Sequence, residues 1–363
     1  MAGRGWRDAL RAAFMVACAL LVTGCAAGRA TGVRVAGNHL ERDGRSFTVH
    51  GVQIVGIVAP QGALRGQYLT AHQHFGAAEI RAARAWGANT IRFQLSEPGL
   101  DPRSPLYSAA YVAEVRSAVQ MARQDGLVVI LSVQDQAPSG EPQPWPMPTA
   151  ETARAWGVLA PLFKDDRGVM YELFNEPALP ATAADWRLWA QGGTAPAWRT
   201  HAAFTAVGAQ ALIDQIRATG AHNVIIVDGL QWAQSLLGQP ALTDPAHALA
   251  FAVHPYFGGW MKPDAVAAWN RNFGTIAARE PVIATEWSEH SGSTGCNADF
   301  ATLGTELVGY LKSHHIGLVG FAFDLPGTIV TGWNYAPTTY AHFNCAVAGG
   351  GPGALIQSWY LGR

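Results

Sequence analysis

Eight short apolar segments, which alternate with amphipathic Ala-rich stretches, predict a (β/α)8 TIM barrel of the α/β class. The segments are continuous apolar runs rather than alternating ones, as expected of parallel strands covered on both faces. The chain has 363 residues, 49% apolar and 14% charged, which suits one large domain with an ample core over residues 33–363. A doubly wound open sheet is the alternative, but Val52–Val58 is not followed by the GxGxxG loop that such a sheet favours.

The elements of this barrel can be placed in order along the chain. Residues 33–51 predict a short N-terminal β-hairpin, whose strands are joined through Asp43-Gly44. The predicted barrel strands are Val52–Val58, Asn89–Leu95, Leu127–Val133, Gly168–Phe174, Asn223–Asp228, Leu249–His254, Pro281–Glu286 and Gly317–Phe323. The predicted helices are Gly76–Trp86, Ala109–Gln124, Thr149–Phe163, Trp198–Thr219, Pro263–Ala278, Asp299–His314 and Gly353–Tyr360, with a weaker pattern around Trp232–Gly238.

Residues 1–24 predict a lipoprotein signal peptide rather than part of the fold. Three arginines precede the apolar run Ala12–Val22, which is too short to span a bilayer. Residues 22–25, VTGC, resemble a bacterial lipobox, which implies cleavage before Cys25 and lipid attachment to its thiol. An ordinary secretory signal is the alternative. In both cases we expect the protein to be exported. With the lipobox, Cys25 would anchor it at the outer membrane or cell surface, with residues 25–32 as a tether; otherwise the protein would be periplasmic or secreted.

The composition restricts the partners. A net charge of −1 and an isoelectric point near 6.9 favour neither nucleic acid nor an anionic membrane surface. Thirteen tryptophans are many, and their flat faces stack well on neutral, ring-shaped ligands. Cys296 and Cys345 form an even pair in an oxidising compartment and predict a disulfide. No Cys or His cluster has the spacing of a metal site, so we expect no metal and no cofactor.

Polar residues end most of the predicted strands. Active sites of (β/α)8 barrels form at the carboxyl ends of the strands, so these residues should share one rim. They are Arg92, Gln134-Asp135, Asn175-Glu176, Asp228, His254-Pro255-Tyr256 and Glu286-Trp287. A single case would be an ordinary solvated strand end, but so many on one rim indicate an active site.

Two of these residues are glutamates, on the fourth and seventh predicted strands. Those strand ends face each other across a barrel mouth, and no GxSxG nucleophile motif competes with them. Paired carboxyl groups are what glycoside hydrolysis requires, because one protonates the leaving oxygen while the other attacks the anomeric carbon or activates water. Glu176 and Glu286 are therefore the candidate catalytic pair. Glu172, four residues before Glu176, is more consistent with a hydrogen-bonded barrel residue.

The chain resembles glycoside hydrolase family 5, a group of retaining (β/α)8 β-glycanases that includes cellulases and mannanases. The resemblance rests on the opening hairpin, NTIRF, YELFNEP, VHPY and VIATEW, in the family's order and spacing. It implies that Glu176 is the general acid/base and Glu286 the nucleophile, about 5–5.5 Å apart. It also implies that Asn175 binds the 2-hydroxyl of the sugar and that Arg92 keeps Glu286 ionised.

The resemblance extends to two further residues and fails at two others. Tyr256 would donate a hydrogen bond to Glu286, and His254 would lie near the acid/base. Where the family has a His after the third strand, this chain has Gln134. Where the family has a Trp platform on the eighth strand, this chain has Phe323 or Asp324. Other rings could take the place of that platform, namely Trp232, Trp287 or Trp333; Trp145 is a further candidate for stacking on substrate.

These observations predict a monomeric, retaining endo-β-glycanase that hydrolyses β-1,4-linked glucan, a neutral polysaccharide or oligosaccharide. Two alternatives with the same mechanism are a β-mannanase and an exo-acting β-glucosidase. A third alternative is a carbohydrate-binding surface lipoprotein without turnover, which the replacements at Gln134 and Phe323 keep open.

Overall fold

The computed structural model describes residues 32–60, 75–134, 144–257, 264–289, 298–344 and 350–363. Residues 32–363 form one compact unit. Cys25, Cys296 and Cys345 lie outside the described residues, so the lipidation and the disulfide stay predictions. Within the described residues, no helix is long and apolar enough to cross a membrane.

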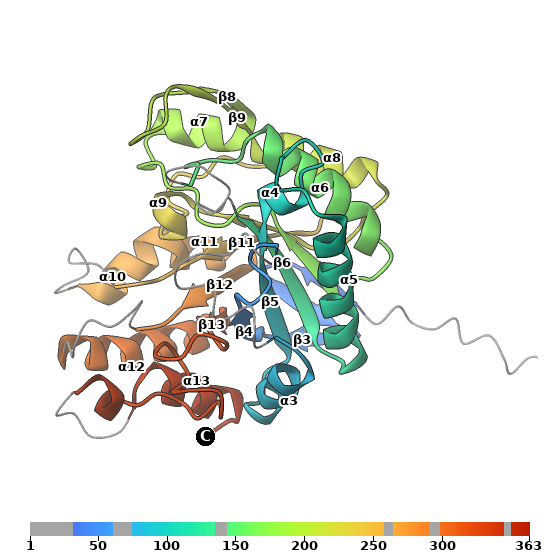
Figure 1. Ribbon diagram of the computed structural model, residues 1–363. Helices are drawn as coiled ribbons and strands as arrows, with labels where there is room; N and C mark the ends of the chain where they lie inside the picture. The colour runs from blue at the N-terminus through green and yellow to red at the C-terminus, as the bar shows by residue number, and fades with distance from the viewer. Residues whose placement is uncertain (1–31, 61–74, 135–143, 258–263, 290–297, 345–349) are drawn as a thin grey trace, which may run out of the picture. The chain divides into compact units, whose positions relative to one another are not determined.

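Eight parallel strands close into a barrel, which confirms the predicted fold class (Figure 1). The strands follow one another around the barrel in chain order, and pairing of β13 with β4 closes it. They are β4 (His50–Ile54), β5 (Thr90–Ser96), β6 (Val128–Gln134), β7 (Val169–Glu172), β10 (Ile225–Asp228), β11 (Leu249–Val253), β12 (Val282–Trp287) and β13 (Gly317–Gly320). Each falls on a predicted apolar segment, with boundaries shifted by a few residues.

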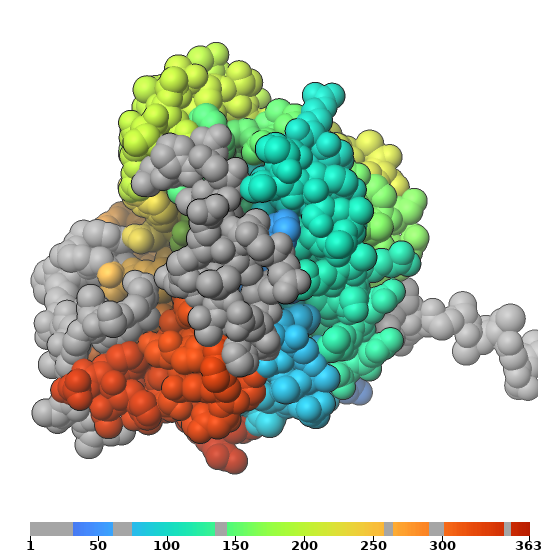
Figure 2. All heavy atoms as spheres, viewed as in Figure 1, coloured from blue at the N-terminus to red at the C-terminus, as the bar shows by residue number. Residues whose placement is uncertain are grey.

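Helices surround the barrel (Figure 1). They are α3 (Ala77–Ala85), α4 (Glu97–Leu100), α5 (Ala109–Gln124), α6 (Ala150–Phe163), α7 (Ala183–Gln191), α8 (Ala209–Ala218), α9 (Leu230–Ala233), α10 (Ala265–Trp269), α11 (Thr275–Ala277), α12 (Ala298–Ser313) and α13 (Pro352–Tyr360). A π-helical turn, Asn270–Gly274, joins α10 to α11, and a short 3-10 helix spans Tyr340–Phe343. In the space-filling view, segments from the middle of the chain and from its C-terminal part lie on opposite sides of the face shown (Figure 2).

The predicted helix Trp198–Thr219 is wrong in its first half. Strands β8 (Gly192–Ala195) and β9 (Phe204–Val207) form an antiparallel hairpin there, and helix begins only with α8. Gly192 adopts φ 72° and ends the unpredicted helix α7, a conformation that glycine adopts without steric cost. The β-prone run FTAV then pairs with β8.

The N-terminal hairpin is confirmed and has a third strand. β1 (Val33–Ala36), β2 (His39–Arg42) and β3 (Arg45–Phe47) form an antiparallel sheet in the order β1-β2-β3. Asp43 and Gly44 both have positive φ, as a tight turn between β2 and β3 requires. Val33 and Leu40 pack against barrel residues such as Val128, so this sheet covers the end at which the strands begin.

Alternation along the strands divides the barrel interior into an apolar and a polar part. Ile130, Met170, Ile226 and Ile283 belong to one buried cluster inside the barrel. Successive side chains of a strand point to opposite faces, so the residues two positions further on also point inward. These residues are Ser132, Glu172, Asp228 and Thr285, all buried and polar. The interior therefore changes from apolar to polar toward the carboxyl ends of the strands, where the expected site lies.

Candidate active site

Arg92, on β5, is the centre of the polar interior. Its side chain is fully buried, and its guanidinium donates to both oxygens of Glu172, at 2.6 and 3.1 Å. It also donates to Glu286 Oε2 at 3.0 Å and to Asn175 Oδ1 at 2.5 Å. Further acceptors are Ser132 Oγ and Gln53 Oε1. Burial alone would lower the pKa of a guanidinium, but the carboxylates of Glu172 and Glu286 raise the pKa of Arg92 above its ordinary value, so Arg92 is charged.

Glu286, on β12, lies between two donors. Arg92 donates to Oε2, and the hydroxyl of Tyr256 donates to Oε1 at 3.0 Å. Burial raises the pKa of Glu286 above its ordinary value, while Arg92 and the Tyr256 hydroxyl act in the opposite direction. The expected effect of Arg92 is thus present, but burial outweighs it. Burial, followed by the negative charge of Glu286, raises the pKa of Tyr256 well above its ordinary value, so Tyr256 remains a donor.

Glu176 follows β7 in a different environment. It has φ 59°, an uncommon conformation for a residue other than glycine, and its backbone N–H donates to Asp228 Oδ2 at 3.1 Å. Its Oε1 lies 2.8 Å from Nδ1 of His254, and its side chain is 27% exposed. Burial raises the pKa of Glu176 to about 7, against the opposing charge of Arg92. This carboxyl group therefore carries a proton for part of the time near neutral pH.

The two glutamates are brought together, as the sequence predicts. Glu176, His254 and Glu286 each place a side-chain N or O atom within 4.8 Å of the other two. One carboxyl group has a neutral neighbour in His254, because burial lowers the pKa of this imidazole to about 4. The other has the Arg92 cation. Such a pair can divide the work of proton donor and anionic nucleophile.

Beneath the pair lie Glu172 and Asp228, both fully buried. Burial would raise the pKa of Glu172, but Arg92 lowers it below its ordinary value, so Glu172 is ionised. Burial and the neighbouring Glu172 raise the pKa of Asp228 well above its ordinary value. Oδ1 of Asp228 accepts a hydrogen bond from no described donor. A proton on Asp228, which hydrogen-bonds to Glu172, lowers the cost of holding two buried carboxyl groups side by side.

Among the described residues, two clusters have enough ligand atoms to hold a metal ion. They are Glu172, Asp228 and His254, and Glu176, His254 and Glu286. In both clusters a carboxylate is already bound by the Arg92 guanidinium. A cation placed there would face this buried positive charge. The geometry therefore favours a hydrogen-bonded proton-transfer site over a metal centre.

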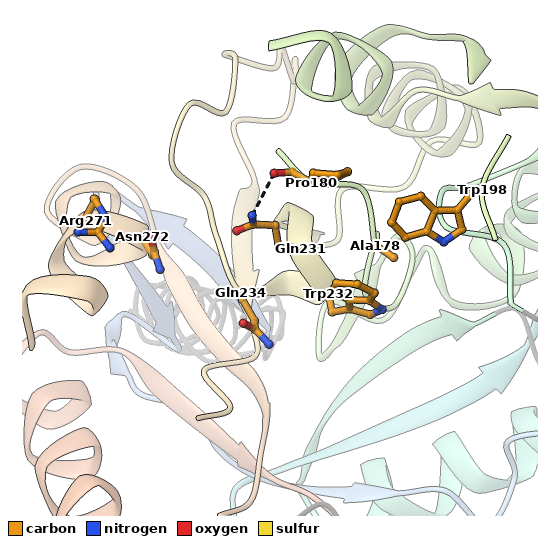
Figure 3. Close-up of a pocket in the computed structure, with 8 residues that line it drawn as sticks. All are labelled: Ala178, Pro180, Trp198, Gln231, Trp232, Gln234, Arg271 and Asn272. Atoms are coloured by element: carbon orange, nitrogen blue, oxygen red, sulfur yellow. Dashed lines mark hydrogen bonds between the residues drawn. The ribbon is translucent and has the colours of Figure 1, made fainter. Parts of the chain in front are cut away.

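A cleft runs past Glu176. The part next to Glu176 is lined by Gln134, Trp145, Asn175, Trp198, Arg199 and Trp232, among others. It continues into a larger cavity of about 550 Å³, which shares Ala178, Trp198 and Trp232 with it. Figure 3 shows the two indole rings at one end of this cavity and Arg271 with Asn272 at the other. Gln231 lies between them and donates to the carbonyl oxygen of Pro180 at 3.0 Å.

The candidate substrate-contacting residues divide into two groups. Gln134 and Trp232 line the cleft, and Trp232 is 40% exposed. Oε1 of Gln134 is buried and has no hydrogen-bond partner among the described residues. Trp287 and Phe323, however, are completely buried in the core around the barrel, so they offer no face to a substrate. Phe323 instead stacks on Tyr335, with ring centroids 5.0 Å apart.

Phe321, directly after β13, is buried in a small cluster with Val55 and Ala322, against which Leu325 packs. The expectation for Phe323 was wrong because β13 ends three residues earlier than predicted. Trp198 and Arg199 were also missed, because they fall within the wrongly predicted helix. An aromatic residue followed by a cation was their only sequence signal.

Comparisons with known proteins show the family of this chain and its similarity in fold to solved structures. Residues 61–325, more than half of the chain, match the family model described as cellulase (glycosyl hydrolase family 5). The fold is similar to that of a β-glucanase from Saccharophagus degradans in complex with cellotetraose (TM-score 0.66, 23% identity, covering 91% of this chain and 93% of the other). It is also similar to a hyperthermophilic endocellulase from the archaeon Pyrococcus horikoshii (TM-score 0.64, 15% identity, 91% and 99%). A third similar structure is the mannotriose complex of a Thermomonospora fusca β-mannanase (TM-score 0.53, 18% identity, 81% and 85%). The family match extends over the strands that carry Arg92, Glu176, His254 and Glu286, and the chain belongs to glycosyl hydrolase family 5.

Proposed function

We propose that this protein is a retaining endo-β-glycanase that hydrolyses β-1,4-linked glucan, with Glu176 as general acid/base and Glu286 as nucleophile. The observation that carries the proposal is the pair itself. Oxygens of the two carboxyl groups lie within 4.8 Å of each other. This separation suits direct attack by one carboxylate, whereas an inverting enzyme needs about 6.5–9.5 Å to place a water molecule.

The environments of the two glutamates fit two successive displacements. In the first, a Glu286 oxygen bonds to the anomeric carbon as the glycosidic C–O bond breaks, and the Glu176 proton passes to the leaving oxygen. In the second, Glu176 takes a proton from water, whose oxygen attacks the anomeric carbon and releases Glu286 as carboxylate. Tyr256 and Arg92 donate to Glu286 and stabilise it as an anion.

The cleft is suited to a chain of sugars. Trp198 and Trp232 offer indole faces to sugar rings, and the unpaired Oε1 of Gln134 can accept from a sugar hydroxyl. Because Glu176 protonates the leaving oxygen, we assign the cavity beside it to the leaving-group half of the substrate. The cellotetraose bound to the Saccharophagus degradans β-glucanase supports glucan over mannan as the first substrate to test.

We further propose that the protein is a monomer and is exported and lipid-anchored through Cys25, as the lipobox indicates. Replacement by Cys25→Ser should release the protein from membranes. Membrane retention equal to that of the wild type would contradict the anchor.

The function is tested by measuring reducing sugar released from cellulose derivatives, mixed-linkage glucan, xyloglucan, mannan and xylan. Wild type is compared with Glu176→Gln and Glu286→Gln, and with Glu306→Gln as a control on the exposed surface of α12. We expect release from β-1,4-glucan by wild type and by the control only. Release from mannan but not from glucan would select the β-mannanase alternative. Binding of polysaccharide without release from any polymer would overturn the enzyme proposal.

A further inference from the structure

A chain of hydrogen bonds leads from the buried base of the barrel interior to the candidate acid. The Thr285 hydroxyl lies 2.8 Å from Glu172 Oε1 and 3.1 Å from Nε2 of His254. The other ring nitrogen of His254, Nδ1, lies 2.8 Å from Glu176 Oε1. Three strands contribute to this chain, since Glu172 ends β7, His254 follows β11 and Thr285 lies within β12.

The direction of every bond in this chain is fixed at the Glu172 end. Arg92 donates to both oxygens of Glu172, which holds that group as a carboxylate. A carboxylate can only accept hydrogen bonds, so the Thr285 hydroxyl donates its single proton to Glu172. The oxygen of Thr285 is then available to His254 only as an acceptor, and Nε2 of His254 must carry the hydrogen.

The consequence appears at the other nitrogen of the same ring. A neutral imidazole with hydrogen on Nε2 has a lone pair on Nδ1. Glu176 Oε1, at 2.8 Å, must then be the donor, which requires a protonated carboxyl group. We propose that Thr285 is a positioning residue that fixes His254 in the Nε2–H tautomer, so that Nδ1 accepts the acid proton of Glu176 in the substrate-free protein. The role of this proton in turnover rests on the proposed function.

No other described group offers His254 a better partner for Nε2–H. Glu172 Oε1 is 3.9 Å and Asp228 Oδ2 is 3.8 Å from Nε2, both beyond a hydrogen bond. The remaining charged or titratable groups of the site hydrogen-bond elsewhere, since Arg92 and Tyr256 both donate to Glu286. None of these contacts reverses the tautomer.

This arrangement accounts for a carboxyl group that stays protonated beside a histidine. The opposite tautomer, with hydrogen on Nδ1, would donate to Glu176 and favour its ionised form. When substrate binds, the glycosidic oxygen replaces Nδ1 as acceptor of the same proton. The leaving oxygen gains that proton as the glycosidic C–O bond breaks and the Glu286 oxygen bonds to carbon.

The test uses the full protein labelled with ¹⁵N-histidine, and reads the His254 tautomer by NMR without substrate. Thr285→Val removes the hydroxyl at nearly constant volume, and Thr285→Ser retains it. Thr305→Val, on the exposed side of α12, is the matched control. The His254 resonance is assigned by its loss in His254→Gln. We expect the Nε2–H tautomer in wild type, Thr285→Ser and Thr305→Val, and gain of the Nδ1–H form in Thr285→Val.

Activity gives the second readout. In Thr285→Val, the alkaline limb of kcat/KM should move down by about one pH unit, because Nδ1–H would stabilise the Glu176 carboxylate. Thr285→Ser, which retains the hydroxyl, should show the alkaline limb at the wild-type pH. An Nδ1–H tautomer in the wild type would overturn the proposal, even if Thr285→Val failed to fold. The proposal would also be overturned if a folded Thr285→Val variant kept both the wild-type His254 tautomer and the wild-type alkaline limb. Absence of turnover in the wild type would contradict the proposed function and leave the tautomer result standing.

Discussion

Replacing Arg92 with Met should destabilise the protein strongly, and more so as the pH rises. Arg92 makes six hydrogen bonds to buried acceptors, two of which belong to Glu172 and one to Glu286. Met has a similar length but no donor, so the substitution leaves two buried carboxyl groups without a cation. Breaking a buried ion pair in this way costs about 3–5 kcal/mol of unfolding free energy at neutral pH.

The pH dependence follows from the pKa of Glu172. In the wild type Arg92 holds the pKa of Glu172 below its ordinary value. The ionised Glu172 therefore stabilises the folded state above the pKa that this group has in the unfolded chain, and this contribution is lost as the pH falls. Without Arg92, burial raises the pKa of Glu172, and the folded state then takes up a proton more readily than the unfolded one. Each carboxyl affected in this way loses up to about 1.4 kcal/mol per unit of rising pH. The cost of Arg92→Met should therefore be greater at pH 7.5 than at pH 5.5.

Urea unfolding monitored by tryptophan fluorescence at these two pH values measures the effect. Arg34→Met is the control, because Arg34 is 60% exposed and its ion pair among the described residues is with Glu41 at the surface. Such exposed pairs contribute about 0–1 kcal/mol. A cost for Arg92→Met below about 1 kcal/mol, or one that does not change with pH, would refute the assignment of Arg92 as the cation that compensates the buried carboxylates.

Three further predictions concern activity, the cleft and the disulfide. The pH profile of kcat/KM should be bell-shaped, because Glu176 loses its proton above about pH 7 and Glu286 gains one in acid. Glu176→Gln should lower the rate on unactivated substrates by about 10²–10⁴ and abolish the alkaline limb of this profile. A profile that stays flat to pH 9 would exclude Glu176 as the acid. Trp232→Ala should raise KM for long oligosaccharides with little change in stability. Trp287→Ala, in the core, should lower the free energy of unfolding in urea by about 3–5 kcal/mol. Equal stability of the two variants would contradict the placement of Trp232 in the cleft and Trp287 in the core. Mass spectrometry of non-reduced peptides should show Cys296 joined to Cys345, and two free thiols would disprove the bond.

The barrel and the rim that carries the candidate site could be predicted because both depend on local patterns. Apolar runs that end in polar residues mark parallel strands and their carboxyl ends, and this placed Arg92, Glu176, His254 and Glu286 in one site. The hydrogen bonds of Arg92 to Gln53 and Ser132 could not be predicted in the same way, since they depend on strand register around the closed barrel.

The wrong predictions fall where the direction of the side chains changes within one or two residues. Trp287 follows an irregularity in the pairing of β12 with β13, after which the alternation no longer tells which side chains face the cleft. Phe323 lies beyond the end of β13, and it packs in the outer core. In α7 and the hairpin after it, the apolar pattern is compatible with helix or strand, and glycine conformation decides between them.

In the proposed mechanism, Glu286 attacks the sugar while Glu176 supplies the proton. This mechanism is tested most directly by incubating the protein with an activated 2-deoxy-2-fluoro-cellobioside, which slows hydrolysis of a covalent intermediate, and sequencing the modified peptide by mass spectrometry. We predict one glycosyl group on Glu286, no adduct in Glu286→Gln, and release of the β-anomer as first product from unmodified substrate. An adduct on another residue, or release of the α-anomer from a β-linked substrate, would contradict this mechanism.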